Sequence, residues 1–176
     1  MARVPLVAPE GRPDLEELAA RISGRRRGRL INVYRALFNA PPLAQSWFDH
    51  LNAVRWSTSL DGRLRELVII RIGYLTRAQY ILKQHIPKLA LADGVSEAEC
   101  SALADWQSHD GWTEKERSAL ALTDAVTREA AASDEIFAAA KSQFGTQGIT
   151  ELTVLIGTYN MHARVMNTLA LDLEQD

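Results

Sequence analysis

The chain has 176 residues, a formal net charge of −2 at pH 7 and one cysteine, Cys100. A chain of this length buries enough surface to fold without disulfides, so we expect one domain over residues 1–176. The small net charge gives no general electrostatic reason to bind nucleic acid or a membrane, and the lone cysteine excludes an internal disulfide and any CxxC motif.

Three amphipathic helices are predicted in the first third of the chain. Residues 13–23, PDLEELAARIS, begin with a proline and acidic residues, and their apolar residues recur every three or four positions. Residues 30–42, LINVYRALFNAPP, end at two prolines, where a helix stops. Residues 42–56, PLAQSWFDHLNAVRW, again place apolar residues at helical spacing.

The segment DGRLRELVIIRIGYL, residues 61–75, is apolar on almost every side of a helix. A helix of this kind is buried at the centre of a protein. A buried strand is the alternative, but the leucine content and Asp61, which is placed as an N-cap, favour the helix. We therefore expect this segment to be the central helix.

Later helix boundaries are marked by short polar signals. They are the capping-box pairs Thr76 and Gln79, Ser96 and Glu99, and Thr113 and Glu116, and the helix-ending glycines Gly94 and Gly145. No pair of alternating strands with a hairpin turn is visible in the sequence. The expected fold is all-α, with about eight helices.

Two segments of the chain resemble each other. GRLRELVIIRIGYLTRAQY and QGITELTVLIGTYNMHARV share a Glu-Leu pair, an apolar run, and then Gly and Tyr. Glu66 thus corresponds to Glu151, and Gly73 roughly to Gly157. This internal repeat predicts two related helices that pack together at the centre of the fold.

Glu66 and His85 are the first candidates for chemistry. A carboxylate on a wholly apolar helix has to find a partner, take up a proton or face a cavity, although a place near a helix N-terminus also suits a structural role. His85 has apolar neighbours at helical spacing and is either a hydrogen-bonded core residue or a catalyst. Pro87 is expected to kink the helix beside His85, because proline has no N–H. Tyr80 shares a pocket with His85 only if a third element lies between them.

Arg71 is the other unexpected charge, because it interrupts the apolar run of the central helix. It either forms an ion pair across a helix or subunit interface, or it anchors a substrate carboxylate. The aromatic residues Trp47, Trp56 and Tyr74 are large enough to line a pocket, and core packing is the alternative for each.

Other recognisable sites are absent from the sequence. There is no GxSxG, P-loop or GxGxxG motif, and His50, His109 and His162 lack metal-ligand spacing, so we expect neither a metal nor a cofactor. The basic run at residues 24–29 is more typical of a solvated segment or an interface than of an RNA site. With no signal peptide and no run of 18 apolar residues, the expected protein is soluble and cytoplasmic.

Two long stretches of the chain resemble the carboxymuconolactone decarboxylase family, which includes the alkylhydroperoxidase D-like proteins. They are residues 59–103, from SLDGRLRELVIIRIGYL onward, and residues 112–165, with the phrases FGTQGITEL and GTYNMHAR. The resemblance covers about residues 30–170. It implies an all-helical alkylhydroperoxidase D-like bundle that assembles as a trimer or hexamer of identical chains.

The redox branch of this family carries a Glu, a CxxC pair at the start of the next helix, and a His four residues after the second Cys. By resemblance, Glu66 and His85 match the Glu and the His. The cysteine positions fall on Ala78 and Ile81, and Tyr80 stands where the redox branch often has another His. Because a thiol peroxidase needs a thiolate, we do not expect peroxidase activity by the family mechanism.

The resemblance instead implies a cofactor-independent acid/base lyase or isomerase. Such an enzyme would act on a small carboxylated lactone or related acid through an enolate. The expected site residues are Glu66, His85 and Tyr80 for catalysis, and Arg71, Trp56 and Tyr74 for substrate binding. Two alternatives stay open: an alkylhydroperoxidase-like antioxidant protein that uses Cys100, and a non-catalytic oligomer that binds a small acid.

Overall fold

The computed structural model describes residues 1–25 and 28–174, so two arginines of the basic run, Arg26 and Arg27, lie outside the described residues. Within these ranges the secondary structure is entirely helical, as predicted. The elements are α1 (Pro13–Arg25), α2 (Asn32–Leu37), α3 (Pro41–Trp56), α4 (Gly62–Leu75), α5 (Gln79–Gln84), η1 (His85–Ala90), α6 (Glu97–Ala102), η2 (Leu103–Ser108), α7 (Glu114–Glu129) and α8 (Asp134–Leu169). The elements η1 and η2 are a π-helix and a 3-10 helix.

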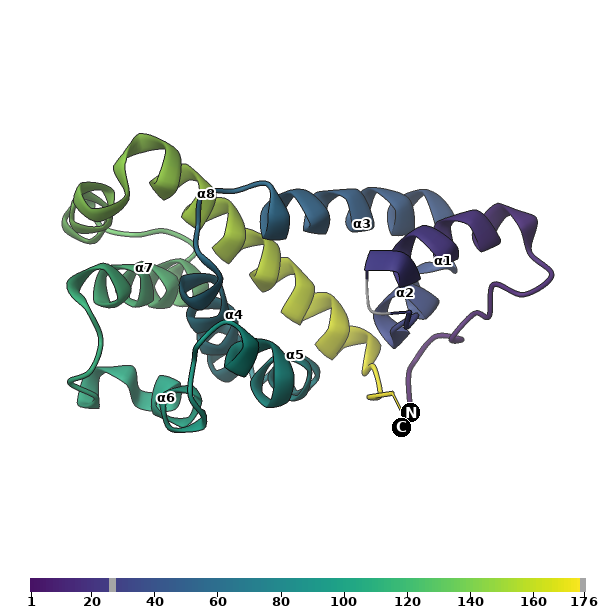
Figure 1. Cartoon of the computed structure of the whole chain (residues 1–176), viewed down its shortest axis with the longest axis horizontal. Helices are drawn as coiled ribbons and strands as arrows, with labels where there is room; N and C mark the ends of the chain where they lie inside the picture. Colours follow the sequence, from purple (N-terminus) through teal and green to yellow (C-terminus); the bar gives the residue numbers. More distant parts are fainter. Residues whose placement is uncertain (26–27, 175–176) are drawn as a thin grey trace.

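The long helix α8 crosses the molecule diagonally and separates two groups of helices (Figure 1). On one side α3 lies against α8, and α1 and α2 pack on α3. On the other side α4 and α7 pack on α8 and on each other, and α5 and α6 complete that group. The two ends of the chain lie together, where the backbone N–H of Arg3 donates to the carbonyl of Leu169 over 2.8 Å.

Helix α4 is the central helix that the apolar segment predicts. Ten consecutive residues, Leu64–Gly73, are buried, and the Asp61 carboxylate accepts a hydrogen bond from the backbone N–H of Leu64 over 2.8 Å as the N-cap. The helix faces two hydrophobic clusters at once. Val68 belongs to the large cluster formed with α1–α3 and α8, whereas Leu67 belongs to a smaller one with residues of α6 and η2. This double packing explains why α4 is apolar on every side.

The repeated segments form α4 and the second half of α8, which pack against each other. Their glutamates have different surroundings, however. Glu66 is fully buried, whereas Glu151 is half-buried and accepts hydrogen bonds from the backbone N–H and the hydroxyl of Ser59. The repeat therefore predicts the paired helices but not a paired site.

Two of the three predicted capping boxes are confirmed, and one is wrong. Ser96 with Glu99 and Thr113 with Glu116 each make both reciprocal hydrogen bonds. Thr76 instead belongs to the end of α4, where its hydroxyl donates to the carbonyl of Ile72, and α5 begins after Ala78 without a side-chain cap. The hydroxyl of a threonine at a helix C-terminus can bond its own last turn, and it is then lost as a cap for the next helix.

Backbone irregularities set the position of His85. Gly73 permits α5 to lie directly on α4, because a Cβ at this residue would come within 2.7 Å of the Leu82 side chain. Beyond α5 the helix widens into the π-turn His85–Ala90, which contains Pro87. The expected disturbance beside His85 is therefore present, and it has the form of a π-helix, a feature that is frequent at functional sites. Farther on, Gly145 has a φ of 65° and kinks α8.

Candidate active site

Helix α4 and the start of η1 bring Glu66 and His85 into direct contact. The Nδ1 atom of His85 lies 2.6 Å from Oε2 of Glu66. Glu66 is 0% exposed and His85 is 7% exposed, so the contact is almost sealed from water. The two residues that the family resemblance pairs are thus neighbours, although 19 positions separate them in the chain.

Arg55 of α3 and Tyr159 of α8 complete this group. The Nη2 atom of Arg55 donates to Oε1 of Glu66 over 3.3 Å, and Nη1 donates to the Tyr159 hydroxyl over 2.7 Å. The Tyr159 ring meets the imidazole of His85 edge to face, with ring centroids 5.8 Å apart. We call Arg55, Glu66, His85 and Tyr159 the Glu66 cluster. Its members come from four different elements.

The Glu66 cluster keeps the carboxylate charged. Burial, the largest influence, pushes the pKa of Glu66 upward, but the charge and hydrogen bond of His85 and the charges of Arg55 and Arg65 outweigh it. The pKa of Glu66 therefore lies below its ordinary value. A neutral Glu66 that donates a proton to substrate, one way to build the expected enolate chemistry, does not fit this environment.

Arg65 and Trp56 hold Arg55 in place. Arg65 donates to the backbone carbonyl of Arg55 over 3.0 Å and to the Asp93 carboxylate over 3.1 Å. Both guanidinium groups lie over the Trp56 ring, at 5.2 Å for Arg55 and 5.1 Å for Arg65. Trp56 itself is 58% exposed. Trp56 therefore lies at the surface over Arg55 and Arg65, and its ring stabilises both guanidinium groups through cation–π contacts.

Tyr80 lies against the C-terminal segment of the chain. Its hydroxyl donates to Oε1 of Glu174 over 2.5 Å, and the Gln84 amide bonds the other oxygen of the same carboxylate. The backbone N–H of Asn32 also donates to Glu174, over 2.7 Å. These contacts tie the end of the chain to α5 and α2, which is a structural role that the sequence did not predict for Tyr80.

Arg71 forms an ion pair within the chain, which is the first of the two roles that the sequence suggested. It is not placed as an anchor for a substrate carboxylate. Its Nε and Nη2 atoms each donate to the Asp124 carboxylate over 2.6 Å, and Nη1 donates to the carbonyls of Leu103 and Ala104. All three guanidinium nitrogens thus serve to join α4 to α7 and η2. We therefore leave Arg71 out of the proposed substrate contacts.

The sulfur chemistry of the redox branch finds no support in the geometry. Ala78 and Ile81, which occupy the family's cysteine positions, are buried in the large hydrophobic cluster. Cys100 is 1% exposed and lies in the smaller cluster, against which the half-buried Tyr74 packs. Burial, followed by nearby acidic residues such as Glu99, raises the pKa of the Cys100 thiol. A protonated, buried thiol is a poor nucleophile.

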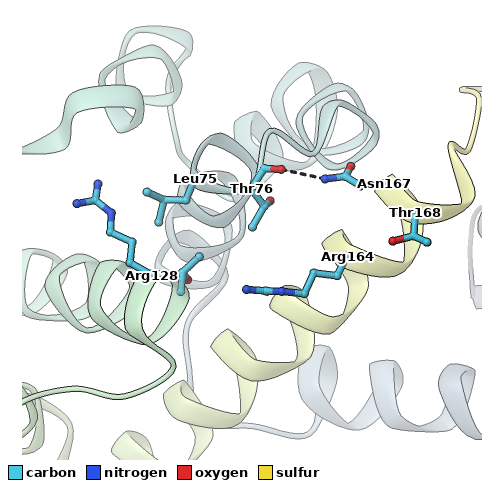
Figure 2. Close-up of a pocket in the computed structure, with 7 residues that line it drawn as sticks. Leu75, Thr76, Arg128, Arg164, Asn167 and Thr168 are labelled. Carbon is cyan, nitrogen blue, oxygen red and sulfur yellow. Dashed lines mark hydrogen bonds between the residues drawn. The ribbon is translucent and has the colours of Figure 1, made fainter.

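Two surface cavities lie away from the Glu66 cluster. The larger one, of about 380 Å³, lies between the end of α4, the end of α7 and the second half of α8 (Figure 2). The smaller one, of about 290 Å³, lies between α3 and α8 beside His50, whose Nε2 is 2.8 Å from the Thr158 hydroxyl. Neither is lined by Glu66 or His85.

Among residues 1–25 and 28–174, no group of three or more His, Cys, Asp or Glu side chains is arranged to hold a metal ion. No helix in these ranges is both long and apolar enough to span a bilayer.

Residues 41–125 match the sequence model of the carboxymuconolactone decarboxylase family. This segment runs from α3 to α7 and contains Arg55, Glu66 and His85. Over this segment, which is just under half of the chain, the sequence is similar to the carboxymuconolactone decarboxylase family. The family resemblance in the sequence is therefore confirmed.

The chain is also similar to individual proteins. The uncharacterised protein YnjA of Escherichia coli (strain K12) is 31% identical over 111 residues, which cover 62% of this chain and 60% of that protein. The matched part is thus about three fifths of the relative's length. A structure from Agrobacterium tumefaciens, of a protein of unknown function suggested to be the antioxidant defence protein AhpD, is 25% identical. It has a TM-score of 0.74 and covers 80% of this chain and 96% of that chain.

Two more distant structures share the fold. The debrominase Bmp8 in complex with 2,3,4-tribromopyrrole has a TM-score of 0.82 at 21% identity, with coverage of 99% of this chain and 94% of that chain. A peroxidase-related protein from Silicibacter sp. TM1040 has a TM-score of 0.85 at 18% identity, with coverage of 98% and 92%. Proteins that share this fold are thus named for different reactions. The fold does not determine the reaction, which depends on the residues of each site.

The sequence predicted half of the Glu66 cluster and missed Arg55 and Tyr159. A signal for both was present. Arg55 follows Leu51 by four positions and is therefore on the apolar stripe of its helix, where a charge needs a partner. Tyr159 lies four residues from both Leu155 and Ala163, on the buried stripe of α8. What the sequence did not contain was the identity of the partner that each one meets.

Proposed function

We propose that the chain is an acid/base enzyme that acts on a small carboxylated lactone or related acid through an enolate, with His85 as the group that transfers the proton. The observation that supports this proposal is the 2.6 Å contact between His85 Nδ1 and a buried, ionised Glu66. A histidine held by a carboxylate is the usual arrangement of a general acid or base.

Glu66 determines which imidazole nitrogen does the chemistry. An ionised carboxylate only accepts hydrogen bonds, so Nδ1 of His85 carries a hydrogen toward Glu66. Proton exchange with substrate then takes place at Nε2. The Glu66 charge also stabilises the imidazolium form, which is the form that donates a proton. His85 retains a small exposed surface while Glu66 has none, which is consistent with His85 as the member that reaches substrate.

In the proposed lyase step, the bond between the substrate carboxylate and its neighbouring carbon breaks and carbon dioxide leaves. The electron pair of that bond forms an enolate, and the His85 imidazolium protonates the vacated carbon. The Tyr159 hydroxyl accepts from Arg55, so its own hydrogen is available for the enolate oxygen. In an isomerisation, His85 would first remove a proton and then return it to another carbon.

The test measures turnover on a panel of carboxylated lactones and 3-keto acids, in which loss of the carboxylate leaves an enolate. His85→Gln and Glu66→Gln are each expected to lower kcat by about 10²-fold or more, because general acid/base groups contribute at least this much. Glu151→Gln is the matched control, since it makes the same change at the equivalent position of the repeat and should retain near wild-type turnover. A loss of less than tenfold in both His85→Gln and Glu66→Gln would contradict the proposal.

A thiol peroxidase is the weaker alternative for this chain. The description as an antioxidant defence protein was given to the Agrobacterium relative and is no evidence for a peroxidase activity of this chain. Here both family cysteine positions are filled by core side chains, and Cys100 is buried with a raised pKa. The acid/base proposal uses only residues that are present in the Glu66 cluster.

A further inference from the structure

The larger cavity has an unusual balance of charge. It is lined by Leu75 and Thr76 from the end of α4, Thr127 and Arg128 from the end of α7, and Arg164, Asn167 and Thr168 from α8 (Figure 2). Two of these lining residues are arginines and none is acidic. The cavity shares no residue with the Glu66 cluster, so any ligand it binds is separate from the acid/base chemistry.

Arg164 is held by neutral groups. Its Nη1 atom donates to the backbone carbonyl of Asn160 over 3.1 Å and to the Asn160 side-chain oxygen over 2.5 Å. Among the residues that the structure describes, no acceptor bonds the Nε or Nη2 atom of Arg164. No carboxylate of these residues forms an ion pair with Arg164 either. Arg55 and Arg71, by contrast, each meet a buried carboxylate. The Arg164 side chain is exposed at the cavity, and no carboxylate among the described residues offsets its charge.

A short chain of hydrogen bonds fixes the Arg164 guanidinium at the cavity. The buried Asn160 amide donates to the Thr127 hydroxyl over 2.9 Å and to the carbonyl of Ile156 over 3.0 Å. These bonds orient the amide so that its oxygen faces Arg164. A cation that is held in place before the ligand arrives loses less entropy on binding. Figure 2 shows the Arg164 side chain extending from α8 toward α7 across the cavity.

Arg128 adds to the positive potential on the other side. Its Nη2 atom lies 3.5 Å from the Asp124 carboxylate, but both oxygens of that carboxylate already accept from Arg71 at 2.6 Å. One negative charge is therefore shared between two arginines, and part of the Arg128 charge remains uncompensated. Together with Arg164, it favours an anion in the cavity.

We propose that this cavity binds the carboxylate of a small organic acid, with Arg164 as its main anchor. The planar fork of a guanidinium matches a carboxylate through two parallel hydrogen bonds. Leu75 and the methyl groups of the three threonines offer apolar surface to the body of the acid, which a bare inorganic anion would not use. A volume of about 380 Å³ lies at the small end of the range for ligand sites.

Isothermal titration calorimetry with acetate, benzoate and succinate, and with inorganic phosphate, tests the proposal. At least one of the three acids is expected to bind the wild type, at least tenfold more tightly than phosphate. Arg164→Gln should weaken that binding about tenfold or more, because a hydrogen-bonded charge is removed. Arg25→Gln, which removes one exposed charge on α1, is the matched control and should bind like the wild type.

A second readout locates the ligand. In arginine-detected NMR spectra, the Nε–Hε signal of Arg164, identified by its loss in Arg164→Gln, should shift when the bound acid is added. Glu66→Gln should leave this binding unchanged, which separates the cavity from the proposed active site. The proposal is overturned if none of the acids binds, if Arg164→Gln binds them normally, or if phosphate binds as tightly as they do.

Discussion

Glu66 shows how a buried charge is tolerated at the scale of single residues. An isolated carboxylate in a low-dielectric interior is strongly unfavourable, whereas a paired and hydrogen-bonded one is accepted. The structure supplies His85 on one carboxylate oxygen and Arg55 on the other. The members of the Glu66 cluster therefore depend on one another. The loss of one member leaves the remaining buried groups without a partner and destabilises the folded state.

The first prediction concerns Arg55. Arg55→Leu should lower the free energy of unfolding by about 3–5 kcal/mol, because it leaves the Glu66 charge buried without its guanidinium partner. Equilibrium denaturation in urea measures this loss. Arg25→Leu, at an exposed site on α1, is the control and should change the free energy of unfolding by about 0.5 kcal/mol or less.

A double variant distinguishes the energy of the Arg55–Glu66 ion pair from the packing that is lost when Arg55 is replaced. In Arg55→Leu combined with Glu66→Gln, the uncompensated charge is gone, so the total loss of stability should be smaller than the sum of the two single losses. Strict additivity of the two substitutions would show that Arg55 and Glu66 do not interact energetically.

At the scale of elements, a charged joint holds α4, α6 and α7 together. Arg63 near the start of α4 donates to the Glu99 carboxylate over 2.5 Å and to Glu116 over 2.8 Å. Glu99 and Glu116 also close the capping boxes of α6 and α7. One arginine thus meets the N-terminal turns of two helices, each through the residue that caps it. The same glutamates that start the helices also decide how they are arranged.

The second prediction is a pH dependence of this joint. The hydrogen bond from Arg63 is the main cause that lowers the pKa of Glu99 from 4.5 to about 2. A group whose pKa is lower in the folded state stabilises the protein above its unfolded pKa and loses that contribution as the pH falls through the folded value. The free energy of unfolding should therefore decrease from about pH 4.5 to about pH 2.

Chemical denaturation at a series of pH values measures this slope. Glu99→Gln should make the slope shallower, because the proton that Glu99 takes up on unfolding is no longer bound. Glu17→Gln, at an exposed position of α1, should leave the slope as in the wild type. An unchanged slope in Glu99→Gln would mean that the joint contributes nothing to acid stability.

At the scale of the whole molecule, the family resemblance predicts a trimer or hexamer. Several large apolar side chains are exposed on the single chain, among them Leu43 and Trp56 of α3 and Val154 and Met161 of α8. Burial of such side chains against another copy is one way to remove them from water. The four residues lie on the two helices that flank the smaller cavity.

The third prediction is therefore the mass of the assembly that the chain forms in solution. Light scattering coupled to size-exclusion chromatography should give three or six chains, and the value should hold on dilution if the interface is apolar and large. Met161→Glu should lower the mass if α8 contributes to the contact, while Glu17→Gln should not. A monomer at all concentrations would contradict the expectation.

The sequence by itself determined the local features of this protein. The apolar run of α4, the Asp61 cap, two capping boxes and the disturbance at Pro87 all depend on residues within a few positions of one another, and each is present in the structure. Such features follow from backbone hydrogen bonding and periodicity, which act over one or two turns. Thr76 failed as a cap because its hydroxyl had a nearer acceptor in α4.

Only the tertiary structure decided the partners of the charged residues. Arg71 meets Asp124 across 53 positions of sequence, and Arg55 meets Tyr159 across 104. Glu66 and Glu151 have similar sequence surroundings, yet one is enclosed by Arg55 and His85 while the other bonds Ser59 at the surface. The physical reason is that the cost of burying a charge is local, whereas the group that offsets it arrives on another helix.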